Sequence, residues 1–139
     1  MKDTTHSHTR IWLHLVWTTA HRAKLLTEGF WEWALQAVPA SLDEDGYLLK
    51  AVGGTDDHVH VLVRIRPDVK VSDVVSRLKG GWTFFMRRQG AGPEFKWQDE
   101  YGAFSVSPDK VEEVERYVRN QVERHASGEV VADLEPAAG

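Results

Sequence analysis

The 139-residue sequence predicts an α+β fold, a single domain in which an antiparallel sheet packs against helices. Along the chain, segments with the two-residue period of a strand are interspersed with segments with the 3.6-residue period of a helix. A short glycine-containing link joins two neighbouring strand segments, which favours a hairpin and therefore antiparallel pairing. With no internal repeat and no clear domain boundary, the domain is expected at residues 10–126, between a flexible tail at 1–9 and an acidic tail at 127–139.

The composition is that of a globular protein, with 42% hydrophobic and 27% charged residues. The chain has no cysteine, which excludes disulfides and zinc–thiolate sites and fits the cytoplasm. No apolar run reaches the roughly 18 residues that a membrane span needs. The first ten residues lack the apolar core of a signal peptide. We therefore expect a cytoplasmic protein without a membrane partner.

The first strand is predicted at residues 10–18, which are rich in β-branched and aromatic side chains. Its faces carry alternate residues, with Ile11, Leu13, Leu15 and Trp17 on one and Trp12, His14 and Val16 on the other. His14 can share a face with histidines further along the chain. Such a histidine is more often a packed, hydrogen-bonded core residue, so it is not counted as a metal ligand. The loop that follows carries Arg22 and Lys24.

A helix is expected to begin after Thr27, a suitable N-cap, and to end before Asp45-Gly46. Its buried stripe is predicted to consist of Trp31, Leu35 and Val38. Residues 47–52 then form the second strand, and the turn at residues 53–56 leads into the third.

The third strand, at residues 57–65, is the segment around which the function is predicted. Val59, Val61, Val63 and Ile65 would face the core, and His58, His60, Leu62 and Arg64 the other side. Two histidines two residues apart on a strand have Cβ atoms about 6–7 Å apart, so both rings can bind one divalent metal if a third ligand arrives. The alternative is a strand whose polar face carries two histidines by chance, and the spacing alone does not decide.

A second helix is predicted over residues 73–89, with Ser72 as its N-cap. Its apolar side comprises Val74, Val75, Leu78, Trp82 and Phe85, and its basic residues are Arg77, Lys79, Arg87 and Arg88. The Gly80-Gly81 pair costs about 1 kcal/mol per residue in a helix interior, which indicates a bend or the close approach of another backbone.

Two short strands are expected at residues 95–98 and 101–107, before a last helix that opens at Ser107-Pro108 and ends at Ser127-Gly128. Its apolar stripe is Val111, Val114, Val118 and Val122. Tyr117 and Gln121 lie one turn apart beside that stripe, where they can reach toward a neighbouring molecule.

The net charge of −4 hides an uneven distribution. Residues 61–97 carry 8 basic and 3 acidic side chains, whereas the segments on either side are acidic. A basic middle can present a local positive surface to phosphates. Six residues are candidates for binding DNA: Arg22, Lys24, Arg77, Lys79, Arg87 and Arg88. Charge alone is equally consistent with solvation of one helix.

Four motifs appear in order: His58-Val59-His60, Trp97-Gln98, the run YGAFSVSP at residues 101–108, and Tyr117-Val118-x-Asn120-Gln121. The series resembles the small single-strand tyrosine transposases of the HUH superfamily, which move minimal bacterial insertion sequences and include the REP-associated tyrosine transposases. The resemblance runs from about residue 10 to residue 125, nearly the whole chain.

The resemblance implies a ferredoxin-like fold and a metal-dependent enzyme that nicks and rejoins single-stranded DNA at hairpin-flanked sites. His58 and His60 match the metal-binding pair, Gln121 the third metal ligand and Tyr117 the nucleophile that forms a 5′-phosphotyrosine. The metal would be Mg²⁺ or Mn²⁺. Members of the family are homodimers with shared active sites, in which the tyrosine helix of one subunit serves the histidine pair of the other. His125, one turn beyond Gln121, is an alternative third ligand.

The chemistry suits these residues without the family, because a positioned hydroxyl can cleave a phosphodiester by covalent catalysis beside a Lewis-acidic metal. Three other classes stay open. The first is a non-catalytic single-stranded DNA-binding protein derived from such a transposase, which would use aromatic side chains to stack bases. The second is a metal-dependent hydrolase of small phosphoesters, and the third is an interaction domain with a fortuitous histidine pair.

Overall fold

The computed structural model describes residues 8–92 and 94–121. Its strands are β1 (Ile11–Thr18), β2 (Tyr47–Gly54), β3 (His58–Ile65) and β4 (Gly102–Val106). Its helices are α1 (Glu28–Ala37), α2 (Val71–Arg88) and α3 (Val111–Arg119), with short 3₁₀ turns η1 (Ala20–Arg22) and η2 (Pro108–Lys110). The predicted tail at 127–139, the end of the last helix, Val122 and His125 lie outside the described residues.

The four strands form one sheet in the order β2-β3-β1-β4, and every neighbouring pair is antiparallel. The chain crosses from β1 to β2 through α1 and from β3 to β4 through α2, so each crossover passes over one strand of the other unit. This interleaved β-α-β arrangement is the ferredoxin-like fold, and it confirms the predicted α+β class.

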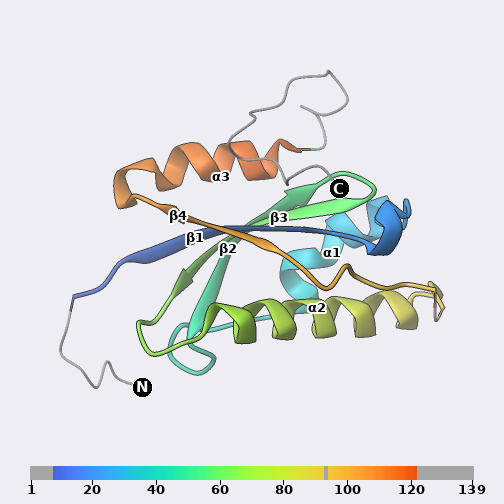
Figure 1. Ribbon diagram of the computed structural model, residues 1–139, viewed down its shortest axis with the longest axis horizontal. Coiled ribbons are helices and arrows are strands. Elements are labelled where there is room, and N and C mark those ends of the chain that lie inside the picture. Colours follow the sequence, from blue (N-terminus) through green and yellow to red (C-terminus); the bar gives the residue numbers. More distant parts are fainter. Residues whose placement is uncertain (1–7, 93, 122–139) are drawn as a thin grey trace.

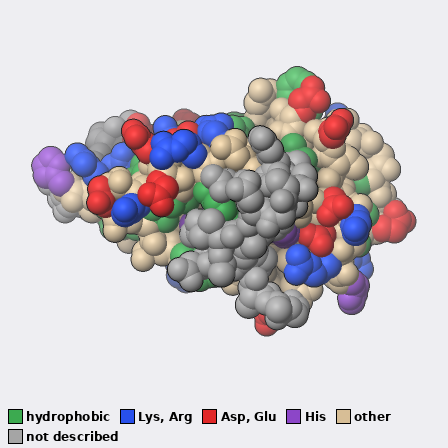
Figure 2. Space-filling view, turned by 90° about the horizontal axis from the view of Figure 1, so that it is seen from above, with side chains coloured by type: hydrophobic (Ala, Val, Ile, Leu, Met, Phe, Trp, Pro, Cys, Tyr) green, Lys and Arg blue, Asp and Glu red, His purple; other side chains and the backbone are tan. Residues whose placement is uncertain are grey.

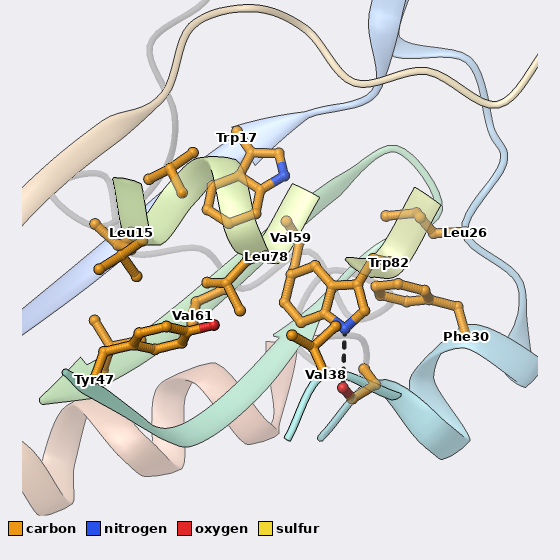
Figure 3. Close-up of a cluster of buried hydrophobic side chains, with 14 of the residues drawn as sticks. Leu15, Trp17, Leu26, Phe30, Val38, Tyr47, Val59, Val61, Leu78 and Trp82 are labelled. Atoms are coloured by element: carbon orange, nitrogen blue, oxygen red, sulfur yellow. Dashed lines mark hydrogen bonds between the residues drawn. The ribbon is translucent and has the colours of Figure 1, made fainter. Parts of the chain in front are cut away.

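The sheet lies between two helical layers, with α1 and α2 below it and α3 above it in Figure 1. The larger core fills the α1–α2 side, where Val59, Val61 and Val63 of β3 meet aromatic side chains from both helices (Figure 3). Trp82 is fully buried there and donates its indole N–H to the Ala34 carbonyl at 2.9 Å. The inward face predicted for β3 is therefore confirmed.

The predicted buried stripe of α1 is correct at Val38, which is buried, and at Trp31, which packs against the core, but wrong at Leu35. Phe30 and Ala34 are its buried residues, whereas Leu35, expected inside, is 38% exposed. The buried positions Leu26, Phe30 and Ala34 recur at four-residue spacing and lead to Val38, because this line of side chains follows the aromatic cluster around Trp82. Helix α1 also ends earlier than predicted, at Ala37.

Helix α2 runs without interruption through Gly80 and Gly81. A Cβ at Gly81 would collide with the Val38 side chain, whereas Gly80 has open space. The sequence predicted either a bend or the close approach of another backbone. The structure shows a close approach, but it is the Val38 side chain that comes near Gly81. The helix begins at Val71, so Ser72 lies in its first turn and Lys70 occupies the N-cap position.

Residues 95–98 do not form the predicted strand; the only β contact in this segment is a single bridge between Trp97 and Thr19. The other predicted face of β3, which carries the two histidines, is covered by α3 (Figure 1). Leu62 and Ala51 pack there against a second apolar cluster that includes Val114 and Val118 of α3. Among the described helices, none is both long and apolar enough to span a membrane.

Candidate active site

Strand β3 places His58 and His60 side by side under α3. The alternation of the strand directs both rings to the same face, with their centroids 5.1 Å apart. His58 is 3% exposed and His60 is fully buried. The sequence predicted the shared face correctly, but not that a helix would remove both rings from solvent.

Tyr117 of α3 lies against this pair. Its ring meets the His60 ring edge-on, with centroids 5.8 Å apart, and is 4% exposed. Gln121, one turn later, is fully buried. The sequence predicted that both side chains can reach toward a neighbouring molecule. In the structure both are buried within their own chain, and the apolar stripe of α3, which includes Tyr117, rests on β2 and β3.

A glycine lets α3 come this close. Gly53 of β2 is the cross-strand partner of His60, and a Cβ at Gly53 would overlap the Val118 carbonyl oxygen. The backbone of α3 therefore touches the sheet beside His60. Arg119 of α3 also donates a hydrogen bond to the Lys50 carbonyl of β2 at 2.8 Å. The tyrosine and the histidine pair meet within one chain, which differs from the shared arrangement that the resemblance implied.

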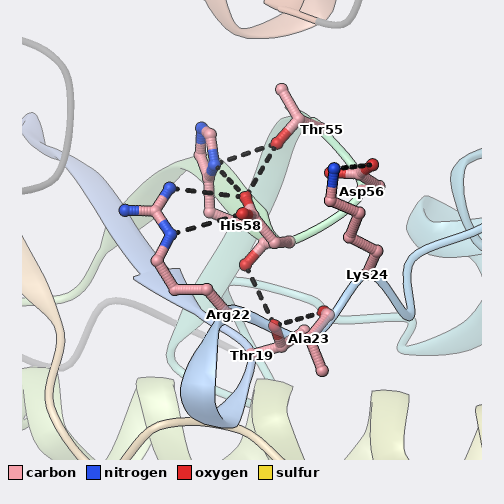
Figure 4. A network of polar contacts seen from close by, with 8 residues as sticks. Thr19, Arg22, Ala23, Lys24, Thr55, Asp56 and His58 are labelled. Atoms are coloured by element: carbon pink, nitrogen blue, oxygen red, sulfur yellow. Dashed lines mark hydrogen bonds and ion pairs between the residues drawn. The ribbon is translucent and has the colours of Figure 1, made fainter.

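A polar network holds His58 from the turn before β3 (Figure 4). Its Nδ1 lies 2.9 Å from Asp57 Oδ1 and 2.9 Å from Thr55 Oγ1. Arg22 donates to Asp57 through Nε at 3.3 Å and through a terminal nitrogen at 3.4 Å. Burial opposes ionisation of the Asp57 carboxyl, but the hydrogen bonds from His58 and Arg22 outweigh it and lower the pKa of Asp57 below 3.8.

His14 on β1 makes a hydrogen bond with the His60 ring. Its Nε2 lies 2.8 Å from His60 Nδ1, and the two imidazoles lie edge to edge with nearly parallel planes and centroids 5.0 Å apart. His14 is fully buried. It is thus the packed, hydrogen-bonded residue that the sequence favoured, yet its partner is one of the candidate metal ligands.

The donor atoms suited to a metal lie on this face. His58 Nε2, His60 Nε2 and Gln121 Oε1 are all shielded from solvent. Within residues 8–92 and 94–121, no three His, Asp or Glu side chains form a metal cluster. The candidate third ligand within this part of the chain is Gln121, while His125 lies outside it.

The six basic candidates do not form one surface. Arg22 and Lys24 lie beside the histidine network, where Lys24 approaches Asp56 at 4.0 Å. The other four project from α2, on the opposite side of the sheet (Figure 1). The outer side of the α3 layer carries basic and acidic side chains interspersed (Figure 2), including the ion pair Arg119–Glu115.

The α2 side chains already have partners within the chain. Arg77 pairs with Asp45 at 3.0 Å, and Arg87 donates to the Phe95 carbonyl. The Lys79 ammonium donates to the Gln98 carbonyl at 2.6 Å, and burial lowers its pKa. Arg88 lies over the ring of Phe84, which is 63% exposed.

Sequence reasoning missed two residues that orient His58, namely Thr55 and Asp57. Both were assigned only to the turn and to the start of the strand. The available signal was that a carboxylate directly before a candidate ligand histidine can accept its second ring N–H, as carboxylates commonly do at metal sites.

Comparisons with known proteins agree with this fold. The family model for IS200-like transposases matches residues 7–121. A crystal structure of a candidate transposase from Deinococcus radiodurans R1 aligns with a TM-score of 0.65 at 23% identity, covering 88% of this chain and 98% of that one. A REP-associated tyrosine transposase bound to a REP hairpin aligns with a TM-score of 0.61 at 13% identity, covering 94% and 76%. No curated protein matches the chain.

At these identities the two solved structures show a shared fold, and the family match carries the assignment. That match spans the whole sheet, the three helices and the cluster from His14 to Gln121. The chain therefore belongs to the family of IS200-like transposases.

Proposed function

We propose that the chain nicks and rejoins single-stranded DNA at hairpin-flanked sites, with Tyr117 as the nucleophile. The observation that carries this proposal is the edge-on contact of Tyr117 with His60, next to His58, in a site shielded from water. A tyrosine next to two imidazoles that can share a metal is a combination suited to phosphodiester cleavage by covalent catalysis.

In the proposed reaction the Tyr117 oxygen attacks phosphorus, and the bond from phosphorus to the 3′ oxygen breaks. The cut strand then has a free 3′-hydroxyl, and its 5′-phosphate is joined to the tyrosine. The proton lost by the tyrosine balances the proton gained by the 3′ oxygen. Attack of a 3′-hydroxyl on the phosphotyrosine reverses the step and rejoins DNA without an external energy source.

The residues present fit a divalent metal, which we propose to be Mg²⁺ or Mn²⁺. His58, His60 and Gln121 would supply two imidazole nitrogens and one amide oxygen, a mixed set that leaves positions open for phosphate oxygens. When bound, the metal polarises the scissile phosphate and stabilises the leaving oxygen. His125 stays an alternative to Gln121 as third ligand.

We further propose single-stranded DNA with hairpins as the partner, in keeping with the hairpin bound to a structural neighbour. Arg22 and Lys24 lie next to the histidine network and would contact phosphates near the cleavage point. Arg77, Lys79, Arg87 and Arg88 would bind more distant phosphates, since they lie across the sheet.

The direct test is to incubate the protein with an end-labelled hairpin oligonucleotide, with and without Mg²⁺ or Mn²⁺, and to run a denaturing gel. We expect a shortened strand and a protein–DNA adduct that require the metal and are lost in the double variant His58→Ala/His60→Ala. Binding without any cleavage would instead identify a non-catalytic single-stranded DNA-binding protein.

Homodimer formation stays a prediction, but we propose that each site is completed within one chain. Mixing the His58→Ala/His60→Ala chain with a Tyr117→Phe chain tests this, since each variant is expected to be inactive alone. With α3 docked on its own sheet, a proven mixed dimer should stay inactive. Recovery of cleavage would show that α3 helices are exchanged and that the sites are shared.

A further inference from the structure

We propose that His14 is a positioning residue that fixes His60 in the form able to bind the metal through Nε2. This inference rests on the proposed function, because it assigns His60 a metal. It adds a role for a strand-β1 residue that belongs to none of the four sequence motifs and lies 46 residues before its partner.

The contact between His14 and His60 is buried and hydrogen-bonded. His14 and His60 are both fully buried, their ring planes lie within 12° of parallel, and His14 Nε2 lies 2.8 Å from His60 Nδ1, in line for a hydrogen bond. Phe104 of β4 packs on the other side of His14, with centroids 6.1 Å apart. Rings held between two neighbours in this way have little freedom to turn.

The hydrogen bond between the rings restricts their tautomers. One nitrogen must carry the proton and the other must accept it. If His60 binds a metal through Nε2, that nitrogen needs its lone pair, so the proton of the neutral ring sits on Nδ1. His60 Nδ1 then donates, and His14 accepts through Nε2. His14 must in turn carry its own proton on Nδ1.

His58 reaches the same state with different partners. Asp57 Oδ1 lies 2.9 Å from His58 Nδ1 and accepts a hydrogen bond from its N–H, and Arg22 holds the carboxylate. The Nε2 of each ring is thereby directed away from its orienting partner. Each candidate ligand thus has a separate device for the same tautomer, a carboxylate for His58 and a neutral imidazole for His60.

The test compares His14→Phe with His14→Gln, measuring Mn²⁺ binding by titration calorimetry rather than cleavage. Phe keeps a flat ring between His60 and Phe104 but cannot accept a hydrogen bond. Gln loses the ring but offers an amide oxygen to His60 Nδ1. We expect His14→Phe to weaken Mn²⁺ binding by about 10- to 100-fold, the range seen for outer-shell partners of metal ligands, and His14→Gln to restore most of it.

A purely packing role predicts the opposite order, with Phe tolerated and Gln harmful. Equal Mn²⁺ affinity in the wild type and in His14→Phe would overturn the proposal. If the wild type itself binds no Mn²⁺, or His60→Ala binds it unchanged, the proposed metal site fails instead.

A spectroscopic measurement on the wild-type protein needs neither a variant nor a metal. Imidazole ¹⁵N shifts, read from long-range ¹H–¹⁵N correlation spectra, distinguish the two neutral tautomers. We expect protons on Nδ1 of both His14 and His60. A proton on Nε2 of His60 in the metal-free protein would contradict the inference, even if His14→Phe failed to fold.

Discussion

Strand β3 is buried on both of its faces, but the two faces are filled differently. Toward α1 and α2, β3 presents Val59, Val61 and Val63, and the cluster around them is apolar. Toward α3 the same strand presents His58 and His60, fully or almost fully buried beside an apolar patch. Burial on the first face stabilises the fold through apolar packing, whereas burial on the second face shields a polar cluster from water.

The two faces of β3 are therefore expected to contribute differently, one mainly to stability and the other mainly to the chemistry of the site. An apolar core is held by area and packing, and its members are replaceable by others of similar volume. A buried polar group must be hydrogen-bonded, and the bond fixes its orientation. Changes below the sheet should therefore alter the free energy of unfolding, and changes above it should alter activity at smaller cost in stability.

The largest expected effect on stability is that of Trp82→Ala on the α1–α2 face. Removing this fully buried indole leaves a cavity and an unmatched Ala34 carbonyl, for which we expect a loss of about 3–5 kcal/mol in urea unfolding. Trp33→Ala is the matched control, because Trp33 on α1 is 46% exposed and should change stability by less than about 0.5 kcal/mol. Similar losses in both variants would contradict the assigned core.

Gly53→Ala should act on the α3 face. The new methyl would meet the Val118 carbonyl, push α3 from the sheet and separate Tyr117 from His60. We expect a loss of about 1–3 kcal/mol, typical of overpacking, together with a fall in cleavage larger than the stability loss explains. Gly80→Ala serves as control, since its site is open and the change should stabilise α2 by roughly 1 kcal/mol. Normal cleavage by Gly53→Ala would show that α3 need not dock there.

The salt dependence of DNA binding can tell which face the strand follows. Lys24 lies beside the histidine network, 4.0 Å from Asp56, and Arg88 lies on α2 over the ring of Phe84. Each should lower the log–log salt slope by about 0.7 on substitution by alanine if it contacts a single-strand phosphate. An effect of Lys24→Ala without one of Arg88→Ala would confine the DNA to the site side of the sheet.

Lys79 should have the smallest effect, visible mainly through pH. Burial lowers its pKa from 10.5, so the unfolded chain binds the proton more tightly than the folded one. Wild-type stability should therefore rise, relative to Lys79→Met, as pH increases from the lowered pKa to 10.5. Urea unfolding at several pH values measures the difference, and a constant difference would mean that Lys79 titrates normally.

Local patterns were sufficient for much of the fold. The strand alternation at residues 57–65 assigned both faces of β3 correctly, and the glycine-containing link gave the β2–β3 hairpin. The α1 stripe was assigned correctly at Val38 but missed Phe30, because Leu35 and Phe30 are similarly apolar and only packing against Trp82 selects between them. The segment at residues 95–98 has strand-like residues but only a single bridge partner.

The sequence motifs named candidate residues for the site, but they could not predict how the chain brings those residues together. His58, His60, Tyr117 and Gln121 were named from their motifs, and the structure brings Tyr117 to His60. Whether α3 covers its own sheet depends on the contact at Gly53, which joins segments 65 residues apart. The His14–His60 bond likewise joins two strands, and no local pattern encodes it.

The central claim is that the tyrosine of the α3 face, and not one elsewhere in the chain, becomes joined to DNA. The three tyrosines allow a matched set of variants, Tyr117→Phe, Tyr101→Phe and Tyr47→Phe, each losing one hydroxyl. Tyr47 lies buried in the core on the α1–α2 side, and Tyr101 is 38% exposed. Incubated with a hairpin oligonucleotide and Mn²⁺, then denatured and weighed by mass spectrometry, only Tyr117→Phe should lack the adduct. An adduct that persists in Tyr117→Phe would contradict the account.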